Sequence, residues 1–140
     1  MSVLKKFENF YRNLSLQSIA HLGDVYAPEA TLIDPLSQHQ GLKCIKDYFE
    51  NLLTNTSKCD CLIQHITEVE GDIFVTWKMR IVHPQLNSGK EFEVDGISHL
   101  KSANDKIVFH RDYYDLGEMI YEQVPLLKHI IRALKRRLVS

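Results

Sequence analysis

The chain has 140 residues and a net charge of −1, with 44% hydrophobic and 25% charged residues, which are ordinary values for a folded domain able to bury its own core. Because the net charge is close to zero, no global field recruits nucleic acid or an acidic membrane. No apolar run approaches the roughly 18 residues that span a bilayer, and the N-terminus lacks the apolar core of a secretory signal. We therefore expect one cytoplasmic domain with no nucleic-acid partner and no stable membrane insertion.

The first third of the chain has helical periodicity. Apolar residues recur at spacings of 3, 4 and 3 over residues 4–14, which predicts a first helix. A second, shorter helix is expected over residues 19–26 and ends before Pro28. The elements expected next are a strand at 30–35 that stops at Asp34 and Pro35, a loop at 36–40 and a helix at 41–55.

The middle of the chain changes to the period of two that strands have. It predicts four strands, at residues 59–69, 73–83, 91–101 and 106–115. Their short connections carry turn residues, such as EGD at 70–72 and SAND at 102–105, and short connections favour antiparallel pairing. Helices followed by a meander of strands predict an α+β fold with the helices laid on one face of a curved sheet.

A last helix is expected from Pro125, with an apolar stripe and a basic face. Three interpretations are open. The helix can be a lid or buttress that docks its leucines on the domain, or it can bind a partner or a membrane surface. The third is nucleic-acid contact, which the absence of interleaved aromatic residues disfavours. Under the first, residues 117–140 are an amphipathic extension packed on a domain of residues 1–116.

The cysteines and histidines argue against a disulfide framework and against a metal site. The three cysteines, Cys44, Cys59 and Cys61, are an odd number, which suits a reducing compartment. None of the seven histidines stands in an H-x-x-x-H or H-E-x-x-H arrangement, and no compact Cys/His cluster occurs. We expect inert thiols, no metal and no cofactor.

One strand, VFHRDYYDLG at 108–117, is unusually polar. Because side chains alternate across a strand, His110, Asp112 and Tyr114 share one face, and Arg111 and Tyr113 lie on the other. Both faces carry polar groups, so periodicity alone leaves open which one points inward.

Four segments, taken in order, resemble a known superfamily: YAPEATLIDP (26–35), GLKCIKDYFENLL (41–53), VDGISHLKS (94–102) and DKIVFHRDYYD (105–115). They are similar to the nuclear-transport-factor-2-like superfamily, and within it to the SnoaL-like, ketosteroid-isomerase-like branch, over roughly residues 3–116. The resemblance implies a cone, in which a strongly bent antiparallel sheet of cystatin-like type wraps on helices, and a homodimer built on the outer sheet face. Members include isomerases, cyclases, dehydratases, epoxide hydrolases and proteins without catalysis, so the fold leaves function open.

The resemblance also implies roles for single residues. Asp34 matches the general base of the steroid isomerases, which follows the first strand in a similar segment. Their oxyanion tyrosine falls on Phe10 or Tyr11, and their second acid falls on Ser98. The oxyanion pair is therefore not reproduced, which disfavours steroid isomerisation.

In the same family the strand face with Asp112 points into the cone, where a carboxylate needs a partner or a proton, and His110 is the natural partner. The expected catalytic residues are Asp34, His110 and Asp112. The expected ligand-binding residues are Tyr11, Tyr48, Phe49, Trp77, Met79, Ile81, Ser98 and Tyr114. A few polar groups in an apolar concavity are typical of a small-molecule site.

We expect a small hydrophobic molecule in this cavity, with Asp/His acid–base chemistry of isomerase, cyclase or hydrolase type. The alternative is a non-catalytic ligand-binding or protein-interaction module. In that case His110 and Asp112 are a satisfied buried pair, and Asp34 only forms its turn.

Overall fold

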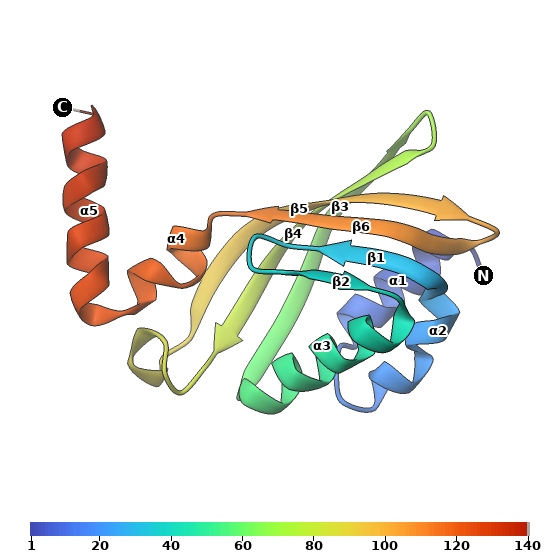
Figure 1. Cartoon of the computed structure of the whole chain (residues 1–140), viewed down its shortest axis with the longest axis horizontal. Helices are drawn as coiled ribbons and strands as arrows, with labels where there is room; N and C mark the ends of the chain where they lie inside the picture. Colours follow the sequence, from blue (N-terminus) through green and yellow to red (C-terminus); the bar gives the residue numbers. More distant parts are fainter. Residues whose placement is uncertain (140) are drawn as a thin grey trace.

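The computed structural model describes residues 1–139 and consists of one curved six-stranded sheet with helices on one face (Figure 1). The strands are β1 (Tyr26–Ile33), β2 (Gln38–Gln40), β3 (Lys58–Val69), β4 (Asp72–Val82), β5 (Phe92–Ala103) and β6 (Lys106–Tyr114). Their spatial order is β2-β1-β6-β5-β4-β3. All neighbours pair antiparallel except β1 and β6, which are parallel. The α+β class and the curved sheet expected from the sequence are confirmed.

Three helices, α1 (Val3–Arg12), α2 (Leu22–Val25) and α3 (Leu42–Asn55), lie on the same side of the sheet (Figure 1). They are followed, after β6, by α4 (Leu116–Met119) and α5 (Pro125–Val139). Single turns of 3₁₀ helix occur at η1 (Ser18–His21), η2 (Asn87–Gly89) and η3 (Tyr121–Gln123). The core lies between α1, α3 and the inward side chains of the strands, which include buried Ile73, Val75 and Trp77 on β4.

Two hairpin turns confirm the turn chemistry of the sequence. Glu70 and Gly71 have φ of 51° and 87° between β3 and β4, and Asn104 and Asp105 have φ of 51° and 62° between β5 and β6. Two consecutive residues at positive φ give a turn whose twist matches that of the strands it joins.

The region around β1 differs from the sequence prediction. Tyr26, expected at the end of a helix, begins β1, and residues 36–40, expected to be a loop, contain the edge strand β2. Tyr26 is fully buried, so tertiary packing overrides the helical spacing of this segment. Pro28, which cannot donate to a sheet ladder, lies where the β1–β6 register is irregular, between Tyr26 and Thr31.

The helix α5 does not dock on the domain as the first interpretation of the sequence expected. No residue of α5 is buried, and it stands apart from the sheet in Figure 1. It contacts η3, and Lys135 Nζ lies 3.0 Å from Glu122 Oε1. The core residues of the sheet pack instead against α1 and α3. No helix among residues 1–139 is long and apolar enough to cross a membrane.

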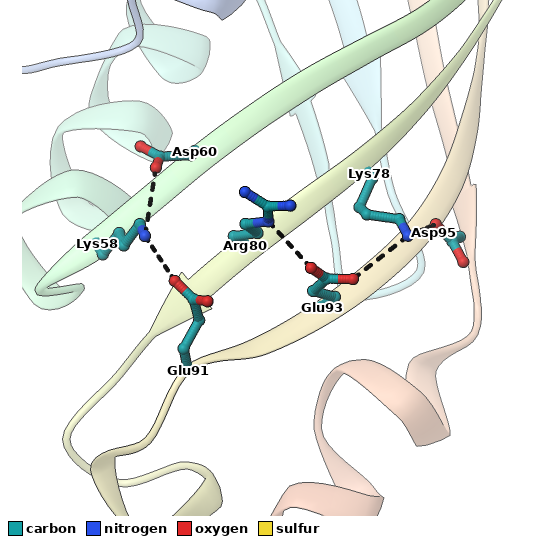
Figure 2. Close-up of polar contacts among 7 residues, drawn as sticks. All are labelled: Lys58, Asp60, Lys78, Arg80, Glu91, Glu93 and Asp95. Atoms are coloured by element: carbon teal, nitrogen blue, oxygen red, sulfur yellow. Dashed lines mark hydrogen bonds and ion pairs between the residues drawn. The ribbon is translucent and has the colours of Figure 1, made fainter.

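The opposite face of β3, β4 and β5 carries alternating charges (Figure 2). Opposite charges on neighbouring strands are paired, as in Lys58 Nζ with Glu91 Oε1 at 2.6 Å and Arg80 Nε with Glu93 Oε1 at 3.0 Å. Lys78 Nζ adds contacts to Glu93 Oε2 at 3.3 Å and to an oxygen of Asp95 at 3.8 Å. These exposed pairs lie on the face of the sheet that points away from the core, and each contributes little to stability.

Candidate functional site

A pocket of about 320 Å³ opens between α3, the inner face of β4 and β6, and the segment that follows β6. Six of the residues expected from the sequence line it: Tyr48, Trp77, Met79, Ile81, Asp112 and Tyr114. The lining is mostly apolar, and Asp112 is its only carboxylate. The volume is at the lower end of the range of small-molecule sites.

Asp112 is held by two hydrogen bonds to the same oxygen. His110 Nε2 lies 2.6 Å from Asp112 Oδ1, and Ser98 Oγ donates to that oxygen at 2.5 Å. Ser98 lies directly opposite Asp112 in the β5–β6 ladder and accepts a hydrogen bond from Trp77 Nε1 at 2.9 Å. The direct partnership of His110 with Asp112 is the one that their common strand face suggested.

Two buried tyrosines extend this network behind His110. Tyr26 Oη lies 2.7 Å from His110 Nδ1, and Tyr11 Oη lies 2.7 Å from Tyr26 Oη. Burial raises the pKa of both phenols well above 10, so both keep their protons. If Tyr11 donates to Tyr26, Tyr26 to Nδ1, and Nε2–H to Asp112, every proton in the row has an acceptor. In this arrangement the imidazole accepts at Nδ1 and donates from Nε2.

The other oxygen of Asp112 is available to a ligand. Asp112 Oδ2 has no hydrogen-bond partner among residues 1–139, and the side chain is 20% exposed where it lines the pocket. A carboxylate that lines an apolar pocket, with one oxygen fixed by two donors and the other without a partner, can accept a proton or a hydrogen bond from a bound molecule.

Tyr114, two residues further along β6, places a hydroxyl group at the pocket. Its hydroxyl has no hydrogen-bond partner among the described residues, and burial, followed by the charges of Asp34 and Asp112, raises its pKa. The phenol is therefore a neutral donor at all ordinary pH values.

Asp34 does not line the pocket. Its Oδ1 accepts from the backbone N–H groups of Leu36 and Ser37, each at 2.8 Å, as expected of a turn-forming aspartate. Its Oδ2 accepts from Tyr48 Oη at 3.0 Å. Burial is the main cause of the raised pKa of Tyr48, and the charge of Asp34 adds to it. Asp34 therefore reaches the pocket only through Tyr48.

The remaining expected residues lie behind the pocket wall. Tyr11, Ser98 and His110 line a separate void of about 20 Å³, and Trp77, Met79 and Asp112 separate the void from the main pocket, since they line both. Such a volume is about that of one water molecule. Phe49 belongs to the core, where its ring packs edge-on against Phe10.

Other pocket residues were not identified from the sequence. Asn51, Leu52 and Asn55 follow Tyr48 on one face of α3, a spacing that could have identified them. No comparable signal marks the rest of the added lining, which consists of Leu36, Thr56, His83, Leu86, Met119 and Ile120. Tyr26 was also missed, because its spacing placed it on a helix.

The described residues contain no group of three or more His, Cys, Asp or Glu side chains that could hold a metal ion. Burial raises the pKa of Cys59 and Cys61 to about 12, so both thiols stay protonated and unreactive, whereas Cys44 is exposed.

Gly96 fixes the position of the pocket wall. A Cβ atom there would lie 2.2 Å from Trp77 Cη2, and the indole cannot turn aside without losing its bond to Ser98. We expect Gly96→Ala to lower the free energy of unfolding by about 1–3 kcal/mol and to shift the emission of Trp77, the only tryptophan. Urea unfolding followed by fluorescence measures both. Gly23→Ala, whose Cβ would meet only Leu42 at 3.5 Å, is the control. Equal effects would contradict the prediction.

Comparison with known proteins gives the family and the fold. The family model of the SnoaL-like domain matches residues 7–110. No functionally curated protein sequence matches the chain at a significant level.

Solved structures agree over most of the chain. A ketosteroid-isomerase-like protein from Catenulispora acidiphila, in complex with trimethylamine, has a TM-score of 0.73 and 14% identity, covering 88% of this chain and 92% of that one. An NTF2-like protein of unknown function from Burkholderia pseudomallei has a TM-score of 0.74 and 15% identity, covering 85% and 95%. A Jannaschia protein that carries the name of a SnoaL-like polyketide cyclase has a TM-score of 0.73 and 10% identity, covering 87% and 90%. These similarities show that the chain shares its fold with ketosteroid-isomerase-like and NTF2-like proteins. The family match confirms the resemblance found in the sequence: the chain belongs to the SnoaL-like domain family.

Proposed function

We propose that this protein binds a small hydrophobic molecule in the pocket beside Asp112 and that Asp112 is the general base acting on it. The observation that carries the proposal is that the two oxygens of the Asp112 carboxylate differ in their hydrogen bonds. Oδ1 is fixed by His110 and Ser98, whereas Oδ2 has no partner among the described residues. A ligand is the group that would complete it, because the pocket wall around it is apolar.

The chemistry that fits is proton transfer next to a carbonyl group. Asp112 Oδ2 takes a proton from the carbon beside the carbonyl, and the electron pair moves to the carbonyl oxygen. The Tyr114 hydroxyl donates a hydrogen bond to that oxygen as charge develops on it. Return of the proton at another carbon completes an isomerisation. In a cyclisation the carbanion attacks a second carbonyl carbon, the electron pair of that carbonyl moves to its oxygen, and this oxygen takes the proton back from Asp112. Neither step needs a cofactor.

The other expected site residues act indirectly in this proposal. His110 is a positioning residue that holds Asp112 in place through a hydrogen bond to Oδ1, and Ser98 bonds to the same oxygen. Asp34 orients Tyr48, whose ring forms part of the pocket wall. Tyr11 supports His110 through Tyr26, and Phe49 supports Tyr48, whose ring centroid is 5.3 Å away. Trp77, Met79 and Ile81 provide the apolar contact surface.

One observation favours a second candidate, a binding module without catalysis. Hydrogen bonds link Tyr11, Tyr26, His110 and Asp112 without interruption. A buried His–Asp pair that serves only to stabilise its strand would form such a network. Ligand binding is common to both candidates, and proton transfer separates them.

The binding test uses the neutral fluorescent probe N-phenyl-1-naphthylamine. Because Trp77 lines the pocket, we expect the probe to quench its emission as it binds. Ile81→Phe, which reduces the pocket volume, should weaken probe binding at least about tenfold, a loss of roughly 1.4 kcal/mol. Leu62→Phe, at an exposed position, is the matched control. Probe binding that leaves Trp77 unquenched, or that both variants retain, would contradict the proposed site.

The homodimer implied by the resemblance and the cytoplasmic location expected from the sequence stay predictions. Exposed apolar side chains on the sheet face away from α1 and α3 support the first of these; they are Leu62, Ile97 and Tyr113.

A further inference from the structure

The helix α5 presents an exposed apolar stripe. Leu126, Ile130, Leu134 and Leu138 recur every four residues along one side of it, with exposed fractions of 76%, 50%, 50% and 86%. The stripe is about 18 Å long at 1.5 Å per residue. Exposed apolar residues that are aligned in this way, unlike single ones scattered on a surface, mark an interaction site.

The same helix concentrates positive charge. It contains five basic and no acidic residues: Lys128, Arg132, Lys135, Arg136 and Arg137. The rest of the chain holds the other 12 of the 17 basic residues and all 18 acidic ones, a net charge of −6. Among the described residues only Lys135 of the five forms an ion pair, with Glu122 and Asp115. The other four cations are free to meet an anionic surface.

The other surfaces of this chain that are described above do not match this helix. Pairing of two α5 helices along their stripes would bring five cations of one copy close to five of another, and like charges repel. The charged face of β3, β4 and β5 offers no alternative, because its acidic groups near Lys58, Lys78 and Arg80 are already paired (Figure 2). The apolar pocket of about 320 Å³ is too small for a helix.

We propose that α5 binds the surface of an anionic phospholipid bilayer, with its leucine stripe among the acyl chains and its basic residues at the headgroups. A lipid surface needs no complementary groove, and an exposed amphipathic helix with a cationic face is suited to it. The negative charge of the rest of the chain leaves α5 as the part that an anionic membrane attracts.

Binding of α5 to a bilayer also indicates which class of ligand the pocket takes. This step rests on the proposed function of the pocket. Met119 and Ile120 line the pocket and lie only a few residues before Pro125, where α5 begins. A bound α5 therefore keeps the pocket rim near the bilayer. The ligand class that this arrangement suits is a lipophilic compound dissolved in the membrane.

The test is flotation of the full-length protein with vesicles of phosphatidylcholine alone or with 30% phosphatidylglycerol. We expect binding to the anionic vesicles at low salt and loss of most of it at high salt, because screening weakens the attraction. Replacing Arg132 or Arg136 by glutamine should weaken binding about fivefold each. The double variant Ile130→Ser and Leu134→Ser should weaken it at least about tenfold. Leu16→Ser, at a residue 53% exposed outside both α5 and the pocket, is the matched control and should bind as the unaltered protein does.

Failure of the membrane proposal can be told apart from failure of the proposed function. No flotation with anionic vesicles, or equal flotation of the stripe variant and its control, would overturn the proposal. So would a lower molecular mass of the stripe variant in light scattering without vesicles, since the stripe would then join copies of this chain. Circular dichroism shows whether the variant keeps its helix. The proposed function fails independently, in probe binding by the pocket, which flotation does not measure.

Discussion

Replacing Asp112 by asparagine is expected to abolish proton transfer while the fold and the pocket stay intact. The amide oxygen can still accept from His110 and Ser98, so the network keeps its hydrogen bonds. The amide nitrogen then takes the place of Oδ2 and cannot act as a base. A positioned general base contributes about 10²- to 10⁴-fold to a rate. We expect a loss of that size in hydrogen–deuterium exchange at the acidic carbon of 2-tetralone, measured by NMR.

Two measurements make this result specific to the pocket. Asp60→Asn is the matched acid-to-amide control, because Asp60 is exposed on β3 and pairs only with Lys58 at 3.7 Å. It should leave exchange unchanged. The Asp112 variant should still bind N-phenyl-1-naphthylamine, which separates binding from catalysis. If the unaltered protein does not accelerate exchange, or the Asp112 variant does so equally well, the general-base role is wrong and the binding module remains.

The second large effect is expected on stability, from His110→Leu. His110 is 1% exposed and joins Tyr26 to Asp112. Without the imidazole, the hydroxyl groups of Tyr11 and Tyr26 keep only the hydrogen bond between them, so one of the two hydroxyl protons has no acceptor. Asp112 also loses one of its two donors. A buried polar group left unpaired costs about 1–3 kcal/mol, and imperfect packing adds to this. We expect the free energy of unfolding to fall by about 2–4 kcal/mol in total, a Tm lower by about 6–12 °C in calorimetry.

The chain provides a natural control for this substitution. His99 Nε2 lies 2.8 Å from Asp72 Oδ1, so it forms a second His–Asp pair of similar geometry, on the surface. The hydrogen bond from His99 lowers the pKa of Asp72, yet both groups keep contact with water. His99→Leu should therefore change Tm far less than His110→Leu. Equal shifts would mean that the strand position, and not the buried network, sets the stability.

The sequence predicted the fold well wherever periodicity and turn chemistry agreed. The four long strands and the turns at Glu70 and Asn104 lie where they were expected, since alternation and positive-φ residues are local signals. Tyr26 was misplaced because its helical spacing is real, but its burial beside β6 decides the structure. The C-terminal helix was identified, while its packing was not, because a stripe of leucines does not specify what it contacts.

The candidate site, like the fold, was predicted where local signals decide the structure and missed where long-range contacts decide it. The common face of His110 and Asp112 follows from strand geometry, and their bond is present in the structure. Asp34 was expected at the pocket from its sequence context, but its side chain is used by its own turn and by Tyr48. Met119 and Ile120 enter the pocket through the path of the chain after β6. Such long-range placement has no periodicity in the sequence.

The parallel pairing of β1 with β6 has a consequence for biosynthesis. Thr31 on β1 pairs with Phe109 on β6, so the first long strand must wait for the last one before it gains that neighbour. At about 5–20 residues per second, the ribosome takes roughly 4–16 s to make the intervening chain. Tyr26 and His110 come from these same two strands. A nascent chain can therefore build the β3–β4–β5 meander early, but it acquires the polar network behind the pocket only after β6 has been made.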